Sequence, residues 1–394
     1  MAGLITWGVL RHGGWPAAAM AVYGDTGQPL GQWRGYAQAI GQRQMRSESN
    51  GHVRPLDAPG LAWREAWRRR SAWPLLGGLL HCYRPRVELV VDDAAAFARQ
   101  SGFSAGHVRQ RIAKVKRSPA GFRLYGAAGE LAGRADHLIL ALGHPALRWP
   151  EAAASQRGNP RITHAYQPHD IRPGSTVLVI GGGMGAAHVW IRALELGADV
   201  VRVHRQPLRR QALNAPRCQF TAAGAAEISL LPATARREAF ARRKGGTIPL
   251  KLAWTWLLWR ERRRVRSHVG EVAAIEEDGA GRLRATLADG AELAVDQVVC
   301  ATGFQPQATA HDLLRQLIDD YRLPLQCGQL ELADDFTIAQ LSGPGGVCGV
   351  VGAAARWTLG AADTFVGIKY AARHLAARIG GAADTPRQER GPCV

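Results

Sequence analysis

The most informative stretch of the chain is Val177-Leu178-Val179-Ile180-Gly181-Gly182-Gly183-Met184-Gly185-Ala186. A helical pattern follows to Leu196, and a second apolar run extends from Ala198 to His204. A strand, a G-x-G-x-x-A turn, a helix and a second strand form the βαβ fingerprint of dinucleotide-binding proteins. In this fingerprint Gly181 permits the tight turn, Gly183 lets the backbone approach a pyrophosphate, and Ala186 keeps the helix close to the strand. We therefore expect a dinucleotide to contact Gly181, Gly183, Met184, Gly185 and Ala186.

The end of the second strand indicates which dinucleotide binds. An NAD site usually carries an acid about 20 residues past the glycines, whereas an arginine there suits the 2′-phosphate of NADP. Here the strand ends in His204-Arg205-Gln206-Pro207, with Arg209 and Arg210 behind it and no acid. We predict NADPH, with Arg205 and Arg209 at the phosphate. A solvated basic face is the alternative, because the whole protein is basic.

Composition narrows the class of protein. The chain has 394 residues, enough for two domains with hydrophobic cores, and a net charge of +18. Arginine far outnumbers lysine in an Ala- and Gly-rich background, so we interpret the charge as solvated surface and expect no nucleic acid partner. The six cysteines form no C-x-x-C, which argues against a metal cluster and a dithiol centre and fits the reduced cytoplasm. We find neither a secretory signal nor an uncharged apolar run of about 18 residues, so no transmembrane segment is expected.

A second, partial fingerprint opens the chain. Met1-Ala2-Gly3-Leu4 leads into a helical pattern, and a strand up to Tyr23 is closed by Gly24-Asp25-Thr26-Gly27. These are the helix and second strand of a βαβ unit without its first strand. Here the chain resembles two-dinucleotide flavoproteins, whose first fingerprint often reads G-x-G-Met-Ala-Gly-Leu. The resemblance implies an FAD site with Gly3 as its third glycine. Asp25, 22 residues further on (25 − 3), has the spacing of an acid on the adenosine ribose, although it also suits a simple turn.

The first strand and two glycines of that FAD site are absent from the sequence as given. We expect either that the recorded start lies downstream of the true one or that the protein is natively truncated; an ordinary N-terminal helix is the remaining alternative. A truncated site would bind FAD weakly, which keeps a catalytically silent NADP-binding protein among the hypotheses.

An internal repeat supports two related nucleotide-binding units. The apolar strand that starts after Asp136 and ends in Gly143 returns after Asp296 and ends in Gly303, at a constant offset of 160 (296 − 136 and 303 − 143). In these flavoproteins each dinucleotide domain closes with a β-meander and such a strand. We predict an α/β fold of two Rossmann-like three-layer dinucleotide-binding domains, each with a β-meander. The expected domains are residues 1-150, FAD-binding and N-terminally incomplete, 151-297, NADPH-binding, and 298-394, the second part of the FAD-binding domain.

The tetrad Ala301-Thr302-Gly303-Phe304 resembles the A-T-G-[FY] motif of the flavin monooxygenase and N-hydroxylase superfamily. There it links the NADPH domain to the FAD domain, which implies cofactor contacts at Thr302 and Gly303. The resemblance also implies flavin contacts at Trp33, in a polar loop from Met45 and Arg46 to Asn50, and at Asp363, which equally suits a helix cap. His164 matches the histidine motif of these enzymes only in its place, so we expect a structural or interdomain hydrogen-bonding role.

Two tryptophan-bearing segments are expected to be buried. Trp63 and Trp67 lie four residues apart and share one helical face, which is typical of core packing. Residues 252–259 are apolar nearly all round, which favours a buried helix at a domain junction over peripheral contact with a membrane.

The resemblance implies an FAD-containing, NADPH-dependent oxidoreductase. In the monooxygenase branch a hydride passes from NADPH to FAD, and molecular oxygen then oxygenates a small nucleophilic substrate through a flavin hydroperoxide. The cofactor carries this chemistry, so we predict no catalytic side chain and no metal. An NADPH:acceptor reductase on the same fold is the second hypothesis. The substrate and the oligomeric state leave no signal in the sequence.

Overall fold

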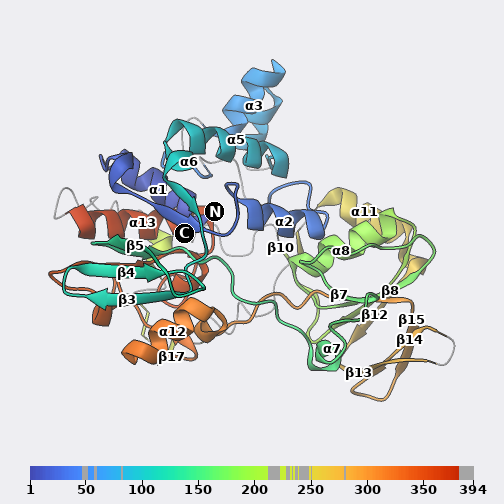
Figure 1. Cartoon of the computed structure of the whole chain (residues 1–394). Coiled ribbons are helices and arrows are strands. Elements are labelled where there is room, and N and C mark those ends of the chain that lie inside the picture. Colours follow the sequence, from blue (N-terminus) through green and yellow to red (C-terminus); the bar gives the residue numbers. More distant parts are fainter. Residues whose placement is uncertain are drawn as a thin grey trace.

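The computed structural model describes residues 1–46, 52–56, 60–80, 83–211, 222–227, 231–232, 234–235, 238, 248–249, 251–278 and 281–380. The described chain forms two α/β units that lie side by side (Figure 1). One unit holds the central fingerprint, and the other combines the N-terminal and C-terminal parts of the chain. Extended crossings of the chain join the two units.

The unit around the fingerprint has a five-stranded parallel sheet. Its order is β12 (Val265–Val269), β9 (Asp199–His204), β8 (Thr176–Ile180), β16 (Gln297–Cys300) and β7 (Ile162–His164). Val177 and Val179 of β8 pack in one core with α8 (Met184–Glu195) and α11 (Leu252–Arg260). Leu178 and Ile180 pack in a second core with α7 (Glu151–Ala154) and the meander of β13 (Val272–Glu277), β14 (Leu283–Leu287) and β15 (Glu292–Val295). Because the side chains of β8 alternate between these cores, the unit has three layers.

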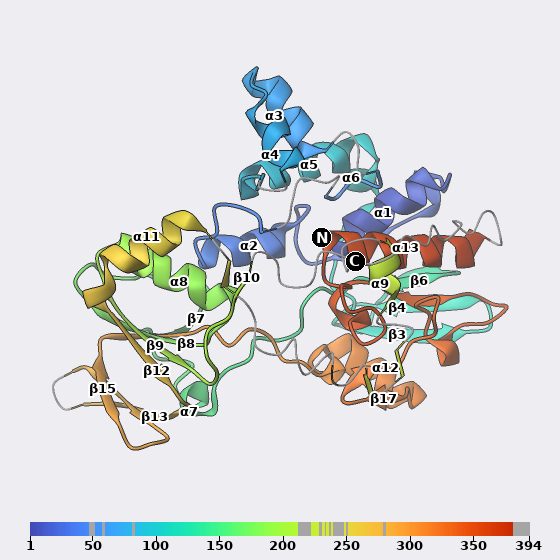
Figure 2. The same cartoon turned by 180° about the vertical axis from the view of Figure 1, so that it is seen from behind.

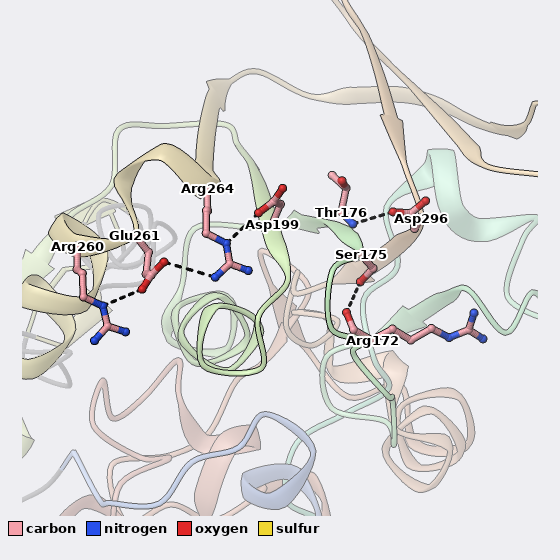
Figure 3. A network of polar contacts seen from close by, with 8 residues as sticks. All are labelled: Arg172, Ser175, Thr176, Asp199, Arg260, Glu261, Arg264 and Asp296. Carbon is pink, nitrogen blue, oxygen red and sulfur yellow. Dashed lines mark hydrogen bonds and ion pairs between the residues drawn. The ribbon is translucent and has the colours of Figure 1, made fainter.

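Polar contacts fasten the edge of this sheet where the strands begin (Figure 3). The N–H of Thr176 donates to the carboxylate of Asp296 at 2.7 Å, which joins the starts of β8 and β16. Arg264, just ahead of β12, pairs with Asp199 of β9 at 3.0 Å and with Glu261 at 3.4 Å. These contacts lie at the amino edge of the sheet. The opposite, carboxyl edge carries the fingerprint turn, where ligands bind in folds of this kind.

The second unit also combines parallel strands, a meander and helices, but its parallel strands are shorter. Strand β1 (Val22–Gly24) pairs in parallel with β2 (His107–Arg109), and β6 (Leu138–Leu140) pairs in parallel with β19 (Cys348–Val350). The meander consists of β3 (Lys114–Ser118), β4 (Gly121–Tyr125) and β5 (Leu131–Ala135). Helix α1 (Ala2–His12) packs on α13 (Phe365–Gly380), and one hydrophobic core joins these elements. The predicted α/β fold of two Rossmann-like units, each with a meander, is confirmed.

The other described elements connect the two units or decorate them. The helices are α2 (Gly31–Ala39), α3 (Leu61–Arg69), α4 (Trp73–Leu79), α5 (Val87–Gln100), α6 (Phe103–Gly106), α9 (Ala222–Glu227) and α12 (Asp312–Tyr321). Short strand pairs are β10 (Arg210–Gln211) with β11 (Ile248–Pro249) and β17 (Leu325–Gln326) with β18 (Gln329–Leu330). One-turn 3₁₀ helices lie at Ala17–Ala19, Arg262–Arg264, Ala308–Ala310, Ala339–Leu341 and Gly352–Ala355. Within the described ranges, no helix is long and apolar enough to cross a bilayer.

The expectation that the tryptophan helices are buried is wrong for several side chains. Helix α3 stands out from the body of the molecule (Figure 2), and Trp63 and Trp67 are 55% and 82% exposed. In α11 only one face is covered: Leu257 is buried, whereas Trp256 and Trp259 are 55% and 63% exposed. The guanidinium groups of Arg260 and Arg262 lie over the rings of Trp256 and Trp259, so a cation–π contact covers part of each ring where a core was expected.

Candidate dinucleotide-binding sites

A cleft of about 780 Å³ opens in the second unit, a size suited to a large ligand. Four of the predicted flavin contacts, Gly3, Asp25, Trp33 and Asp363, line its wall. The first residues of α1 also lie in the wall, so the N-terminus of a helix faces the cleft. Backbone N–H groups at such a terminus favour anionic ligands.

Asp25 and Arg205 occupy matching positions in the two units. Asp25 follows directly on β1, and Arg205 follows directly on β9. Both side chains are exposed, so each is accessible to a ligand. The acid suits the ribose hydroxyls of one dinucleotide and the base suits the 2′-phosphate of the other.

Two buried histidine nitrogen atoms in the cleft wall have no hydrogen-bond partner among the described residues. Among the described residues, none forms a hydrogen bond with Nδ1 of His144 or Nε2 of His311, although both histidines line the cleft. Burial lowers the pKa of both imidazoles, which keeps them neutral. Since buried polar atoms usually have partners, these atoms fit a polar ligand such as the ribityl or phosphate part of FAD. Sequence reasoning missed both histidines because neither stands in a motif.

Asp363 does not cap the last helix. Thr364 takes that role, because its Oγ1 accepts a hydrogen bond from the N–H of Gly367 at 3.1 Å. The carboxylate of Asp363 instead pairs with Arg356 at 2.8 Å. Burial raises the pKa of the Asp363 carboxyl, but the charge of Arg356 and the hydrogen bonds to the carboxylate lower it by more, so the group is ionised. Asp363 therefore brings a negative charge to the cleft wall.

The predicted loop contacts Met45 and Arg46 lie away from this wall. Met45 is buried in the core and its N–H donates to the oxygen of Pro85 at 2.8 Å. The guanidinium of Arg46 donates to the oxygen of Gln211 at 2.6 Å, which ties this loop to β10. Burial and the neighbouring Arg84 lower the pKa of Arg46 to about 10. Residues 47–50 of the predicted loop lie outside the described residues.

The central fingerprint has the backbone geometry that its glycines predict. Gly181 has φ +137°, and a Cβ there would lie 2.4 Å from the oxygen of Ala301, so only glycine fits. Gly183 precedes the first turn of α8, and Met184, Gly185 and Ala186 form that turn. A Cβ on Gly185 would lie 3.1 Å from the hydroxyl of Tyr166. The N–H groups of this turn are thus available to a pyrophosphate at the carboxyl edge of β8.

The predicted phosphate-binding arginines lie beyond the end of β9. The guanidinium of Arg205 is 3.7 Å from the carboxylate of Glu271, and both side chains are more than half exposed. Such an exposed pair is weak, so Arg205 is free to turn to a ligand phosphate. Arg209 is exposed as well, and its backbone oxygen accepts from Ile248 at 2.8 Å.

Thr302, Gly303 and His164 lie at the crossing between the units and not in the cleft wall. The hydroxyl of Thr302 donates to the oxygen of Arg148, and the N–H of Arg148 donates to the oxygen of Gly303 at 2.9 Å. His164 is fully buried beside them, and its Nδ1 accepts from the N–H of Tyr166 at 3.2 Å. Burial lowers the pKa of His164 to about 4. A structural or interdomain role for His164 stays a prediction.

An aromatic chain connects the cleft with the fingerprint. Tyr36 of α2 lines the cleft and lies 5.3 Å from Tyr166, measured between ring centroids. Tyr166 stacks on Phe304 at 4.9 Å, and its hydroxyl reaches the first turn of α8 beside Gly185. Burial raises the pKa of Tyr166 to about 12, so this hydroxyl stays protonated. The two candidate sites therefore meet at one junction.

As for metals, the described residues contain no group of three or more His, Cys, Asp or Glu side chains able to hold an ion.

Solved structures match almost the whole chain. The FAD-bound cadaverine monooxygenase of the desferrioxamine pathway from Erwinia amylovora matches with a TM-score of 0.76 and 15% identity, over 99% of this chain and 96% of that chain. Ornithine hydroxylase from Pseudomonas aeruginosa matches with a TM-score of 0.74 and 16% identity, over 96% of each chain. The ornithine N-hydroxylase from Kutzneria sp. 744, solved with reduced FAD, NADP⁺ and L-ornithine, matches with a TM-score of 0.73 and 16% identity, over 96% of each chain.

A scan against protein-family models and a search of curated proteins found no match. The structural matches establish the class of fold, which is that of flavin-dependent N-hydroxylating monooxygenases with two dinucleotide-binding domains. This confirms the resemblance drawn from the tetrad and the two fingerprints.

Proposed function

We propose that this chain is an FAD-containing, NADPH-dependent monooxygenase that oxygenates a small nucleophilic substrate with molecular oxygen. The observation that carries the proposal is the junction at which the cleft and the fingerprint turn meet, through Tyr36, Tyr166 and Phe304. Two dinucleotides bound there would have their reactive ends near one another, as hydride transfer requires. FAD, when bound, supplies hydride acceptance and oxygen activation.

The chain's own residues bind and orient the cofactors in this proposal. Gly3 and the start of α1 hold the FAD pyrophosphate, and Asp25 holds the adenosine ribose. Trp33 packs against the bound flavin, and Met45 and Arg46 support the site from outside the cleft wall, Arg46 through its hydrogen bond to Gln211. Asp363 with the two cleft histidines orients the polar chain of FAD, and Thr302 and Gly303 hold the junction.

The NADPH site uses the central fingerprint in the same way. Gly181, Gly183 and the first turn of α8 contact the pyrophosphate, and Arg205 and Arg209 contact the 2′-phosphate. The proposed domain division stays at residues 1-150, 151-297 and 298-394, with a cytoplasmic location. Sequence and fold leave the substrate open, but the similar enzymes are named for ornithine and cadaverine, so primary amines are the first class to assay.

An absorption spectrum tests the proposal directly. The purified protein, with FAD added, should show oxidised-flavin bands that NADPH bleaches under anaerobic conditions and that oxygen restores. Oxygen consumption coupled to an added amine then separates a monooxygenase from an NADPH:acceptor reductase. A protein that binds no FAD under any condition, yet binds NADPH, would instead be a catalytically silent NADP-binding protein.

A further inference from the structure

Helices α3 and α4 form a hairpin, residues 61–80, whose outer surface is apolar. A Cβ on Gly78 of α4 would lie 3.6 Å from that of Ala62 in α3, so the two helices pack closely. Their inner faces are covered, since Ala66 and Gly77 are buried. The outer surface carries six large apolar side chains that are 48% to 82% exposed: Trp63, Trp67, Trp73, Leu76, Leu79 and Leu80. A group of exposed apolar side chains of this size is typical of a contact surface.

The same hairpin carries positive charge that its own residues do not balance. Glu65 is the only acidic residue of the hairpin. Its carboxylate pairs with Arg69 at 2.6 Å and accepts a hydrogen bond from the hydroxyl of Tyr83. Arg68 and Arg70 are exposed, and neither forms an ion pair within the part of the chain that the structure describes. Uncompensated guanidinium groups therefore accompany the apolar side chains.

This combination fits an anionic lipid surface. Tryptophan and leucine side chains enter the headgroup region of a bilayer, where guanidinium groups also reach the lipid phosphates. A second copy of this chain would bring its own arginines to such a contact, and each copy carries a net charge of +18, so the two would repel. A nucleic acid would neutralise the arginines but offers no apolar layer for the leucines.

The tryptophans of α11 are also exposed but have partners within the protein. The guanidinium of Arg260 lies 4.7 Å from the ring centroid of Trp256, and that of Arg262 lies 5.2 Å from that of Trp259. The carboxylate of Glu261 pairs with Arg260 at 2.7 Å. Among the described residues, no cationic group covers a tryptophan ring of the α3–α4 hairpin in this way. The two exposed tryptophan pairs therefore allow a matched comparison.

We propose that the α3–α4 hairpin docks this chain on the surface of a membrane that contains anionic lipids. Trp67 and Trp73 enter the headgroup region, and Arg68 and Arg70, at the end of α3, contact lipid phosphates. The hairpin stands out from the body of the molecule (Figure 2), so it can reach a flat surface before the two α/β units do. This inference concerns where the protein lies and does not depend on the proposed reaction.

Binding to lipid vesicles tests the apolar part of the contact. The full chain is sedimented with vesicles of phosphatidylcholine containing about one third phosphatidylglycerol, and with vesicles of phosphatidylcholine alone. The variant Trp67→Ser with Trp73→Ser removes two exposed rings from the hairpin. The control, Trp256→Ser with Trp259→Ser, removes two exposed rings from α11. Thermal unfolding of each variant first shows that the fold is retained.

A second pair of variants separates the hairpin from the overall charge. Arg68→Gln with Arg70→Gln removes two charges from the hairpin. Arg123→Gln with Arg134→Gln removes two exposed charges that lie opposite one another on β4 and β5, in another part of the molecule (Figure 1). A protein that is drawn to vesicles by its net charge alone would respond equally to both changes.

The parent chain should bind the anionic vesicles at least about tenfold more tightly than the neutral ones. The tryptophan and arginine changes in the hairpin should each weaken this binding at least about tenfold, and their controls by less than about threefold. Equal losses in the two arginine variants, or unchanged binding after loss of Trp67 and Trp73, would overturn the proposal. So would a parent chain that ignores both kinds of vesicle, or one that self-associates through these tryptophans in the analytical ultracentrifuge.

Discussion

The rings of His144 and Phe304 stack face to face, with centroids 4.4 Å apart and planes at 8° to each other. These residues are equivalent in the internal repeat, since 304 − 144 is again 160. Around them Leu147 and Phe304 form an antiparallel bridge, and the N–H of Gln305 donates to Ala146 at 2.8 Å. Corresponding points of the two units therefore touch, and this contact links the two proposed cofactor sites.

Replacing Phe304 should loosen the junction more than it damages either unit. We expect Phe304→Leu, which keeps an apolar side chain of similar size but loses the stack, to lower stability by only about 1 kcal/mol. The rate of flavin reduction by NADPH should fall by about tenfold or more, because the two cofactors lose their alignment. Stopped-flow reduction, with NADPH affinity measured in parallel, checks this. A normal reduction rate in a folded Phe304→Leu protein would show that the stack does not align the sites.

Gly181→Ala should abolish NADPH binding. The added Cβ would lie 2.4 Å from the backbone oxygen of Ala301, and φ +137° is closed to alanine, so the turn and β16 must move. We expect a loss of about 2–4 kcal/mol in the free energy of unfolding, measured with urea. Gly290→Ala is the matched control, because Gly290 also has positive φ, +89°, but no neighbour within 4 Å of a Cβ. Similar losses in both variants would mean that backbone strain alone, and not the close approach, explains the effect.

Arg205 should decide between NADPH and NADH. Arg205→Ala removes a charge-assisted contact to the 2′-phosphate, so NADPH affinity should fall by about tenfold while NADH affinity stays the same. Glu271→Gln removes the acid 3.7 Å from Arg205 and should tighten NADPH binding slightly. Titration of nicotinamide fluorescence measures both cofactors. If Arg205→Ala weakens NADPH and NADH equally, the arginine belongs to a general basic face.

Acid should destabilise the protein through its buried histidines. The pKa of His164 falls from 6.5 to about 4 on burial, so between these values the unfolded chain binds a proton that the folded chain does not. The folded state, which keeps His164 neutral, loses no stability to this proton above pH 6.5. As the pH falls from 6.5 towards 4, proton binding by the unfolded chain lowers the free energy of unfolding by roughly 3 kcal/mol at most. His188, whose pKa burial lowers to about 3, acts in the same direction. Urea unfolding at pH 7.5 and pH 5 should show a smaller difference for His164→Asn than for the parent chain; an unchanged difference would assign the acid sensitivity to other groups.

The sequence predicted the parts of the fold whose signals are local. Short patterns predicted the strand, turn and helix around Gly181 and the position of Asp25 just after a strand, and the repeat predicted the second meander. The exposure of Trp67 did not follow, because spacing shows which face a side chain shares but not whether another element covers that face. The contact between His144 and Phe304 was equally hidden, since it depends on how two crossings 160 residues apart meet in space.

Asp363 and Thr364 offer the sharpest separation of flavin binding from helix stability. The sequence suggested Asp363 as the cap, but adjacent residues can both cap, and the structure gives that contact to Thr364 and turns Asp363 towards Arg356 and the cleft. Thr364→Ala should therefore cost about 1 kcal/mol of stability and leave FAD affinity unchanged. Asp363→Asn keeps the shape of the side chain but removes its charge. Because the Asp363 carboxylate orients the polar chain of FAD in our proposal, this variant should bind FAD about tenfold more weakly. Thermal unfolding and flavin titration of both variants measure this. If Asp363→Asn binds FAD normally and is only less stable, the Asp363–Arg356 pair holds the loop and has no part in the cofactor site.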